Sequence, residues 1–478
     1  MQGSDIQMNG NGNGNGADAE LEASASGPHE EMEPISREER RHFANVLRSF
    51  DEYLPYCLLA NNARRNSFLS LPRAHQQLLS DVGKPLPLPR LDTYSSVSSS
   101  ASTAAATAVE PGQGFRARLE EVDDRIRRNA DLLAQIVDES RGFLGEDQSL
   151  LDESAAMSGS GAESETPGHS HNHGHHQHGA VLASSSSSGQ RRKRRKIRGH
   201  DVDKIQSTLK QLVRDWSVEG RDERNAVYAP ILEAVEQRYG SIPFEERGEI
   251  RILVPGAGLG RLAFDFAAKG FSCQGNEFSF HMLLTSHHIL NKTTAPLQHT
   301  IYPFVHSSSN WREAGDMLRA ISIPDVLPST LPHTCEFSMV AGEFVEVYSK
   351  PQEQKAWNVV ATCFFIDTAK NVLRYLETLN NTLPIGGHWI NAGPLLWHFE
   401  NTGNSSTGSS PGADSLSIEL TLDEVIDLVA KMGFEIEEQR TLPPAPYTAS
   451  LNGMLEYNYH PEFFVCRKVR DIAPAPVV

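Results

Sequence analysis

Residues 248–279 limit the folds open to this 478-residue chain more than any other segment does. Residues 250–254 are a short, apolar, β-branched run, which is typical of a buried strand. A glycine-rich turn at residues 256–260 follows, then a helical pattern over residues 261–269, a second apolar run, and Glu277 at the end of that run. Two strands joined by a glycine turn and a helix, the second ending in an acid, predict a parallel sheet that binds its ligand at the carboxyl ends of the strands.

The spacing of the glycines narrows the class of ligand. Glycine lets the backbone approach a ligand without a Cβ in the way, and an acid at the tip of the second strand can accept hydrogen bonds from both hydroxyls of a ribose. A nicotinamide fingerprint needs a third glycine at position 261, where this chain has Arg261 after Gly256, Gly258 and Gly260. We therefore expect a cofactor that contains adenine and ribose. An NAD-dependent oxidoreductase is the weakest candidate, and a glycine turn that serves only the sheet is the alternative without a ligand.

Later segments continue the alternation of strands and helices. Residues 337–341 and 357–366 predict the third and fourth strands, and a helix begins after the fourth strand at Asp367. A capping-box pattern opens a helix at residues 421–432, and residues 463–466 suit a last strand. This order predicts an α/β fold with a doubly wound, mostly parallel sheet. Its ligands should lie at the strand ends that carry Gly256, Glu277, Glu343 and Asp367.

Composition separates folded from unfolded parts. The hydrophobic content of 39% is below the roughly 45–50% of a typical globular chain, and the deficit lies in segments rich in Gly, Asn, Ser and His. We expect residues 1–34, 144–200 and 471–478 to be disordered, together with a linker at 94–114 and a loop at 403–414. Residues 35–143 otherwise form an N-terminal helical region, which could cover the active site or make a homodimer. Residues 201–470 form the main domain.

Charge and motif content exclude several classes and suggest a location. The net charge of −17 argues against a chain built to coat nucleic acid, without excluding it as a partner, and no apolar run approaches the ~20 residues of a membrane span. Five scattered Cys without a CxxC argue against a disulfide framework or a cysteine zinc site. The run RRKRRKIR at residues 191–198 predicts a nuclear localisation signal read by an importin, or else a solvated charge run. We therefore expect a soluble protein of the cytoplasm and nucleus. The six His between positions 169 and 178 are read as low-complexity sequence, and no metal requirement is predicted.

Five strings carry a resemblance to a known family. They are STLKQLVRDWS from residue 207, ILVPGAGLGRLA from 252, CQGNEFSF from 273, ATCFFIDTAKN from 361 and INAGPLLWHFEN from 390. In this order they resemble the carnosine N-methyltransferase family. These are class I, Rossmann-like, S-adenosylmethionine-dependent enzymes that methylate an imidazole nitrogen of histidine-containing dipeptides. The resemblance covers about residues 201–468, with a weaker helical similarity over residues 36–143.

The resemblance implies roles for particular residues. It implies cofactor contacts from before the sheet and from the strand ends: Gln211, Arg214, Gly256, Glu277, Glu343, Phe344 and Cys363, with Gly258 and Gly260 completing the glycine turn. Glu343 stands where members of the family carry Asp. The change keeps the negative charge but makes the side chain longer. For a small peptide substrate it implies Asp367, His398, Tyr447, and Tyr457 or Tyr459.

The chemistry of imidazole methylation independently favours a carboxylate at Asp367. Transfer from a sulfonium is an in-line displacement that needs no protonation of the leaving group, and positioning alone can lower the barrier by ~7–11 kcal/mol. The imidazole must be neutral at the attacking nitrogen while the other nitrogen carries a proton. A carboxylate that faces this N–H fixes the tautomer and stabilises the developing positive charge. Asp367, after a buried apolar strand, suits that role as the catalytic residue.

Each residue also has an interpretation without a catalytic role. Asp367 could cap the following helix, His398 could be a core histidine, Tyr457 and Tyr459 could flank a strand, and Cys363 could be small core packing. Two alternatives to a dipeptide methyltransferase also remain open at this stage. One is a methyltransferase acting on protein histidine or RNA, and the other is a cofactor-binding scaffold without turnover.

Overall fold

The computed structural model describes residues 8–9, 37–80, 82, 114–141, 199–332, 335–400, 417–447 and 452–472. Most of the segments predicted to be disordered lie outside these residues, as do the histidine tract and residues 191–198. All the predicted site residues lie within them. None of the helices in these ranges is long and apolar enough to cross a lipid bilayer.

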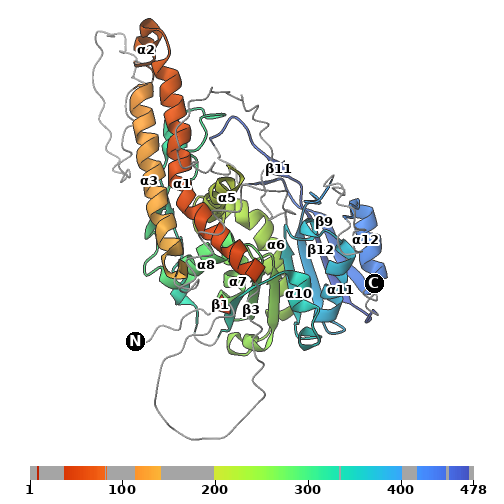
Figure 1. Cartoon of the computed structure of the whole chain (residues 1–478). Helices are drawn as coiled ribbons and strands as arrows, with labels where there is room; N and C mark the ends of the chain where they lie inside the picture. Colours follow the sequence, from red (N-terminus) through yellow and green to blue (C-terminus); the bar gives the residue numbers. More distant parts are fainter. Residues whose placement is uncertain are drawn as a thin grey trace, which may run out of the picture.

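A single eight-stranded sheet forms the centre of the molecule (Figure 1), in the order β1-β6-β3-β2-β7-β8-β12-β9. In that order the strands are β1 (Met8–Asn9), β6 (Phe337–Ala341), β3 (Ser272–Glu277), β2 (Arg251–Pro255), β7 (Val359–Cys363), β8 (His388–Gly393), β12 (Glu462–Lys468) and β9 (Phe434–Thr441). Neighbours from β1 to β8 are parallel, whereas β12 runs antiparallel to both β8 and β9. The predicted doubly wound, mostly parallel sheet is therefore confirmed.

Helices cover both faces of the sheet because its strands are apolar on both faces. Ile252 and Val254 of β2 pack into a core with α5 (Gly199–Trp216), α6 (Arg221–Tyr239), α7 (Arg261–Ala268) and α8 (Phe280–Lys292). Leu253, between them in sequence, packs on the opposite side with α10 (Phe344–Tyr348), α11 (Val372–Thr382) and α12 (Leu422–Lys431). Because β2, β3, β6 and β7 run parallel to one another, their carboxyl ends lie at the same edge of the sheet.

Two long N-terminal helices pack side by side and extend away from the sheet (Figure 1): α1 (Arg37–Leu69) and α3 (Phe115–Arg141), with the short α2 (Arg73–Ser80) after α1. Their buried side chains include Val46, Leu47, Val122 and Ile126. These helices join the main domain and pack against α5 and α8. Polar contacts fix the junction, since Ser49 Oγ lies 2.9 Å from His281 Nε2 and Tyr53 Oη lies 2.8 Å from His306 Nε2.

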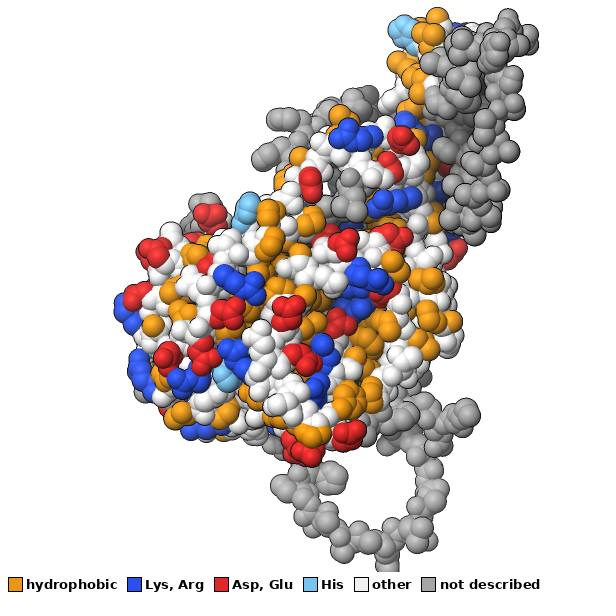
Figure 2. Space-filling model, turned by 180° about the vertical axis from the view of Figure 1, so that it is seen from behind, with side chains coloured by type: hydrophobic (Ala, Val, Ile, Leu, Met, Phe, Trp, Pro, Cys, Tyr) orange, Lys and Arg blue, Asp and Glu red, His pale blue; other side chains and the backbone are white. Residues whose placement is uncertain are grey.

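The remaining elements form the edges of the domain. Two small antiparallel pairs are β4 (His299–Ile301) with β5 (Ile321–Ile323), and β10 (Ala445–Pro446) with β11 (Asn458–Tyr459). Short helices are α9 (Ala314–Leu318), η2 (Phe244–Glu249), η3 (Pro328–Thr330), η4 (Pro351–Glu353) and η5 (Ile366–Thr368). On the face shown in Figure 2, the Lys and Arg side chains are interspersed with Asp and Glu.

Two details of the predicted fold are wrong. The fourth strand, expected over residues 357–366, ends at Cys363, because Phe364 takes a positive φ of 52° and the backbone then turns into η5. The following helix does not begin at Asp367. It begins at Val372 and is capped by Asn371, whose side chain accepts a hydrogen bond from Leu373 N at 3.0 Å. The interpretation of Asp367 as a helix cap is therefore contradicted.

Candidate active site

The glycine turn after β2 depends on residues without a Cβ. Gly256, Gly258 and Gly260 have φ values of 66°, 55° and 80°, in the left-handed region that other residues adopt at a cost. A Cβ on Gly256 would lie 2.5 Å from the ring of Phe365, and one on Gly258 would lie 3.2 Å from Gln211 Nε2. The turn therefore exposes bare backbone to α5 and to the end of β7, which is the arrangement needed for close approach of a ligand.

Glu277 ends β3 and is held against this turn. Its Oε2 accepts a hydrogen bond from Gly258 N at 2.8 Å, while Oε1 accepts from Phe278 N at 2.9 Å and Ser279 N at 2.8 Å. Burial raises the pKa of Glu277, and the three backbone donors lower it in part. The strand end thus places a fixed carboxylate beside the turn, as recognition of a ribose diol requires.

Glu343 and Phe344 lie at the end of the next strand, β6. The Glu343 carboxylate caps α10 by accepting from Glu346 N at 2.8 Å, and burial raises its pKa. Phe344 is 3% exposed, and its ring packs edge-on against Phe365 and Tyr375 with centroids 5.4 Å apart in each case. The carboxylate is therefore near the common edge of the strands, whereas the Phe344 side chain belongs to the core.

Gln211 and Arg214 approach the turn from α5. Arg214 Nε donates to Asp215 Oδ1 at 2.9 Å, and its guanidinium lies 5.5 Å from the centre of the Tyr447 ring. Burial alone would lower the pKa of Arg214, but the carboxylate of Asp215 and the nearby tyrosines raise it, so the side chain stays charged. Gln211 Nε2 lies 3.5 Å from Asp215 Oδ2. Asp215 thus orients both residues, although sequence reasoning did not single it out.

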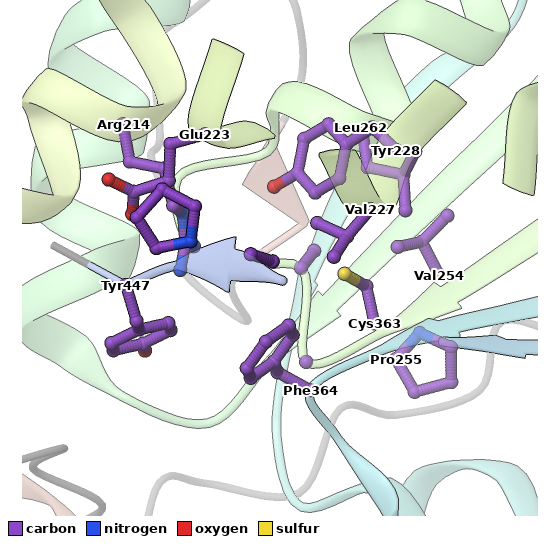
Figure 3. Close-up of a pocket in the computed structure, with 14 residues that line it drawn as sticks. Arg214, Glu223, Val227, Tyr228, Val254, Pro255, Leu262, Cys363, Phe364 and Tyr447 are labelled. Atoms are coloured by element: carbon purple, nitrogen blue, oxygen red, sulfur yellow. The ribbon is translucent and has the colours of Figure 1, made fainter. Parts of the chain in front are cut away.

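A pocket lies where these elements meet (Figure 3). It is lined by Arg214, Glu223, Val227, Tyr228, Val254, Pro255, Gly256, Ala257, Leu262, Cys363, Phe364, Ala445, Pro446 and Tyr447. Cys363 forms part of its wall, and burial raises the pKa of this thiol to about 12. Because the thiol is neutral at physiological pH, Cys363 presents a small, uncharged surface to the pocket.

Asp367 is the most unusual acid at this edge. It is 2% exposed, on the short helix η5. Its Oδ2 accepts a hydrogen bond from Leu396 N at 2.9 Å, while Oδ1 has no hydrogen-bond partner among the residues that the structure describes. Burial raises the pKa of Asp367 to about 7. A buried acceptor without a donor costs free energy in the free protein, so it is the expected signature of a group that a ligand completes.

His398 and three aromatic residues surround the same region. His398 N donates to the Asp367 carbonyl oxygen at 3.1 Å, which keeps the two residues together. Phe364 stacks on Tyr447 with ring centroids 5.2 Å apart, and Tyr459 meets both rings edge-on at 5.5 and 5.6 Å. Figure 3 shows the Phe364 and Tyr447 side chains next to one another in the lining of the pocket. The third predicted tyrosine, Tyr457, is 44% exposed, and its carbonyl oxygen accepts a hydrogen bond from Tyr447 N at 3.2 Å.

Comparison with known proteins assigns the family. The model of the family described as "Carnosine N-methyltransferase" matches residues 191–470. This chain belongs to the carnosine N-methyltransferase family. It is 48% identical over 267 residues to the carnosine N-methyltransferase of Schizosaccharomyces pombe, over 56% of this chain and 71% of that one. It is 44% identical over 268 residues to that of Mus musculus, over 56% of this chain and 64% of the mouse protein.

The solved structures that resemble this member of the carnosine N-methyltransferase family are less similar to it in sequence than these relatives are. The magnesium protoporphyrin IX methyltransferase of Synechocystis PCC 6803 is 10% identical, with a TM-score of 0.31 and coverage of 53% of this chain and 88% of that one. TehB of Haemophilus influenzae is 12% identical, with a TM-score of 0.30 and coverage of 50% and 62%. These TM-scores are low, and the strand order itself defines the fold.

The sequence did not single out Phe364, which lines the pocket, or Tyr375, a core residue near the acids at the strand ends. Phe364 was read only as part of an apolar strand, and its positive φ has no signal in the sequence. The Tyr375 hydroxyl lies 3.2 Å from Thr368 Oγ1, and its ring stacks on Phe365 at 4.8 Å. Burial raises the pKa of Tyr375, and the charges of Glu343, Glu277 and Asp367 raise it further, so its hydroxyl lies within electrostatic reach of all three acids.

Metal ligation has no support in the described part of the chain. No group of three or more His, Cys, Asp or Glu side chains there could hold a metal ion.

Proposed function

We propose that this protein transfers a methyl group from S-adenosylmethionine to an imidazole nitrogen of histidine in a carnosine-like dipeptide. The observation that carries the proposal is the buried Asp367 carboxylate, with one oxygen held by Leu396 N–H and the other without a donor among the described residues. Membership of the carnosine N-methyltransferase family supports the same reaction.

The residues at the strand ends fit the proposed cofactor. The bare glycine turn and the fixed Glu277 carboxylate suit the ribose, while Glu343, at the end of the next strand, would lie towards the adenine. Gln211 and Arg214 would hold the charged methionine end from α5. When bound, S-adenosylmethionine supplies a methyl group on a positively charged sulfur, which makes that methyl electrophilic.

Asp367 would act on the substrate through its free oxygen. The Oδ1 atom would accept a hydrogen bond from the imidazole N–H, which leaves the lone pair of the other ring nitrogen directed at the methyl group. As that nitrogen bonds to the methyl carbon, the bond from that carbon to sulfur would break and S-adenosylhomocysteine would leave. The ring becomes positively charged, the adjacent carboxylate stabilises the charge, and the ring N–H proton would then leave by way of Asp367. The substrate N–H would also supply the hydrogen bond that Asp367 Oδ1 lacks among the described residues, so burial of this acid favours binding of the ring.

The aromatic residues would hold the ring in line. The rings of Phe364, Tyr447 and Tyr459 contact one another, and Tyr459 lies within electrostatic reach of Asp367. Aromatic faces attract cations as well as flat apolar rings. They would therefore bind the imidazole and favour its positively charged product state. His398, tied to the Asp367 backbone, would contact the polar part of the dipeptide.

A transfer assay tests the proposal. Purified full-length protein is incubated with S-adenosylmethionine labelled in its methyl group and with carnosine, and the product is located by mass spectrometry. Label on the imidazole ring is expected, and none with Asp367→Ala. Transfer to histidine-containing proteins or to RNA, with carnosine unlabelled, would contradict the dipeptide substrate. Binding of S-adenosylhomocysteine without transfer to any of these acceptors would contradict an enzyme.

A further inference from the structure

The C-terminal end of α5 is capped in an unusual way. The last carbonyl groups of a helix have no partner within it and are normally satisfied by water or by a turn. Here Arg224, from the next helix, donates through Nη1 to the carbonyl oxygens of Arg214 at 3.0 Å and Ser217 at 2.7 Å. Arg224 is only 2% exposed, so a buried guanidinium replaces water at this helix end.

Arg261 completes the cap from the other side. This residue begins α7 directly after the glycine turn, and its Nη1 donates to the Asp215 carbonyl oxygen at 2.9 Å. The backbone N–H of Asp325 donates to the Trp216 carbonyl oxygen at 2.8 Å. Consecutive carbonyl groups at the end of α5 are thus held by groups from three other segments of the chain.

One carboxylate connects the two arginines. Asp325 accepts a hydrogen bond from Arg224 Nη2 through one oxygen and from Arg261 Nη1, at 2.6 Å, through the other. The side chains of Arg224, Asp325 and Arg261 are 2%, 3% and 10% exposed. Asp265 further neutralises Arg261 at 2.9 Å. Buried ion pairs are weak contributors to stability because desolvation opposes the attraction. A network of this kind is better explained by the geometry that it fixes.

The geometry that it fixes is the position of α5 over the glycine turn. Trp216 Nε1 donates to the Leu259 carbonyl oxygen in the turn at 3.1 Å, and the Arg261 guanidinium lies 5.1 Å from the centre of the Trp216 ring. Arg214 lies in the last turn before this anchored end, and Gln211 lies about one and a half turns before Trp216. Their reach towards the turn therefore depends on how the end of α5 is held.

We propose that Arg261, together with Arg224 and Asp325, is a positioning residue that sets α5 over the glycine turn so that Gln211 and Arg214 reach the methionine end of the cofactor. The inference rests on the proposed function, because it assigns a task to the proposed cofactor contacts. It also explains the departure from the nicotinamide fingerprint at position 261. A glycine there could not bond the end of α5, whereas arginine joins the turn, the helix end and Asp325 at once.

Binding of S-adenosylhomocysteine, measured by isothermal titration calorimetry on the full chain, tests the inference. Arg261→Lys keeps the charge but cannot make the three contacts of the guanidinium. We expect it to weaken binding by about tenfold, the size typical of coupling within a hydrogen-bonded network. The KM for S-adenosylmethionine should rise in proportion, with a much smaller fall in kcat. In an Arg214→Ala background, Arg261→Lys should weaken binding by clearly less than in the wild-type background, because one of the two side chains that it positions is already gone.

Arg247 provides a matched control. It is another largely buried arginine that donates to carbonyl groups, those of Gly240 at 2.9 Å and Ile242 and Lys269 at 3.0 Å, but at the opposite edge of the sheet. Arg247→Lys should lower the melting temperature comparably and leave the affinity unchanged. Asp325→Asn, which keeps the backbone bond to Trp216, provides a second variant if Arg261→Lys does not fold, and should also weaken binding.

The outcomes separate the inference from the proposed function. The positioning role of Arg261 would be overturned if the wild type binds S-adenosylhomocysteine and the variants Arg261→Lys, Asp325→Asn and Arg247→Lys all bind it with equal affinity. Additive effects of Arg261→Lys and Arg214→Ala would also overturn it. Failure of the wild-type protein to bind S-adenosylhomocysteine would instead contradict the proposed cofactor.

Discussion

Replacing Asp367 by asparagine should change how the stability of the protein depends on pH. Burial raises the pKa of Asp367 from its usual 3.8 to about 7 in the folded state. The folded protein therefore keeps this proton to a higher pH than the unfolded chain does. By linkage, the contribution of Asp367 to the free energy of unfolding falls as pH rises from about 4 to about 7. Above pH 7 the folded state carries the full cost of the buried charge.

The size of the effect follows from the same two pKa values. At about 1.36 kcal/mol per pKa unit, the buried charge destabilises the fold by up to about 4 kcal/mol above pH 7. Asparagine keeps an oxygen for the Leu396 N–H but introduces an amide NH₂ that needs an acceptor, at a cost of about 1–3 kcal/mol. The net gain of Asp367→Asn at pH 8 should be on the order of 1–3 kcal/mol, and it should vanish or reverse near pH 5.

Urea unfolding at pH 5, 6.5 and 8 measures this difference. Asp427→Asn, at an exposed position on α12, serves as the control and should show the pH dependence of the wild type. A constant difference in unfolding free energy between Asp367→Asn and the wild type at all three pH values would refute the reasoning. So would a loss of stability by this variant that is largest at pH 8.

Four further predictions concern activity and location. The kcat/KM of the wild type should rise with pH and level off above pH 7, because the Asp367 carboxylate must be ionised to accept a hydrogen bond from the imidazole N–H. A flat pH profile of kcat/KM between pH 6 and 8 in initial-rate assays would contradict this prediction. Glu277→Gln should weaken S-adenosylhomocysteine binding by about tenfold in calorimetry through loss of a charged acceptor, and unchanged affinity would argue against a ribose contact. Phe364→Ala should raise the KM for carnosine by about tenfold or more and leave cofactor affinity nearly unchanged, whereas a fall in cofactor affinity alone would place Phe364 outside the substrate site. Replacing the seven basic residues of 191–198 by Ala should move a fluorescent fusion from nucleus to cytoplasm, and an unchanged distribution would leave the segment without that role.

The sequence predicts those parts of the site that depend on local patterns. The strand before Gly256, the helix after it and the acid at Glu277 follow from neighbouring residues, and the structure reproduces each within one or two positions. Strand β9 was missed because its inner positions Phe434 and Ile436 alternate with charged residues at an edge of the sheet. Its outer residues resemble a solvated loop more than a buried strand.

Other features of the site depend on contacts between segments that are far apart in the chain, and a single sequence gives no pattern from which these contacts can be predicted. The environment of Asp367 is set by Leu396 N–H, 29 residues later, and the role of Arg261 depends on Asp325, 64 residues later. Periodicity fixes the face on which a side chain lies but not its partner across the fold. The sequence therefore predicted Asp367 as a candidate, whereas its unpaired oxygen and raised pKa required the structure.

The most direct test of the central claim compares methyl transfer to carnosine by the wild type and by Asp367→Asn at pH 7.5. Both proteins are first shown to be folded and to bind S-adenosylhomocysteine with similar affinity, so that only the contact to the imidazole N–H differs. Loss of the charged acceptor should lower kcat/KM by about 100-fold or more, with the product of the wild type methylated on the ring. A kcat/KM for Asp367→Asn within about threefold of the wild type would show that the carboxylate does not hold the reacting imidazole.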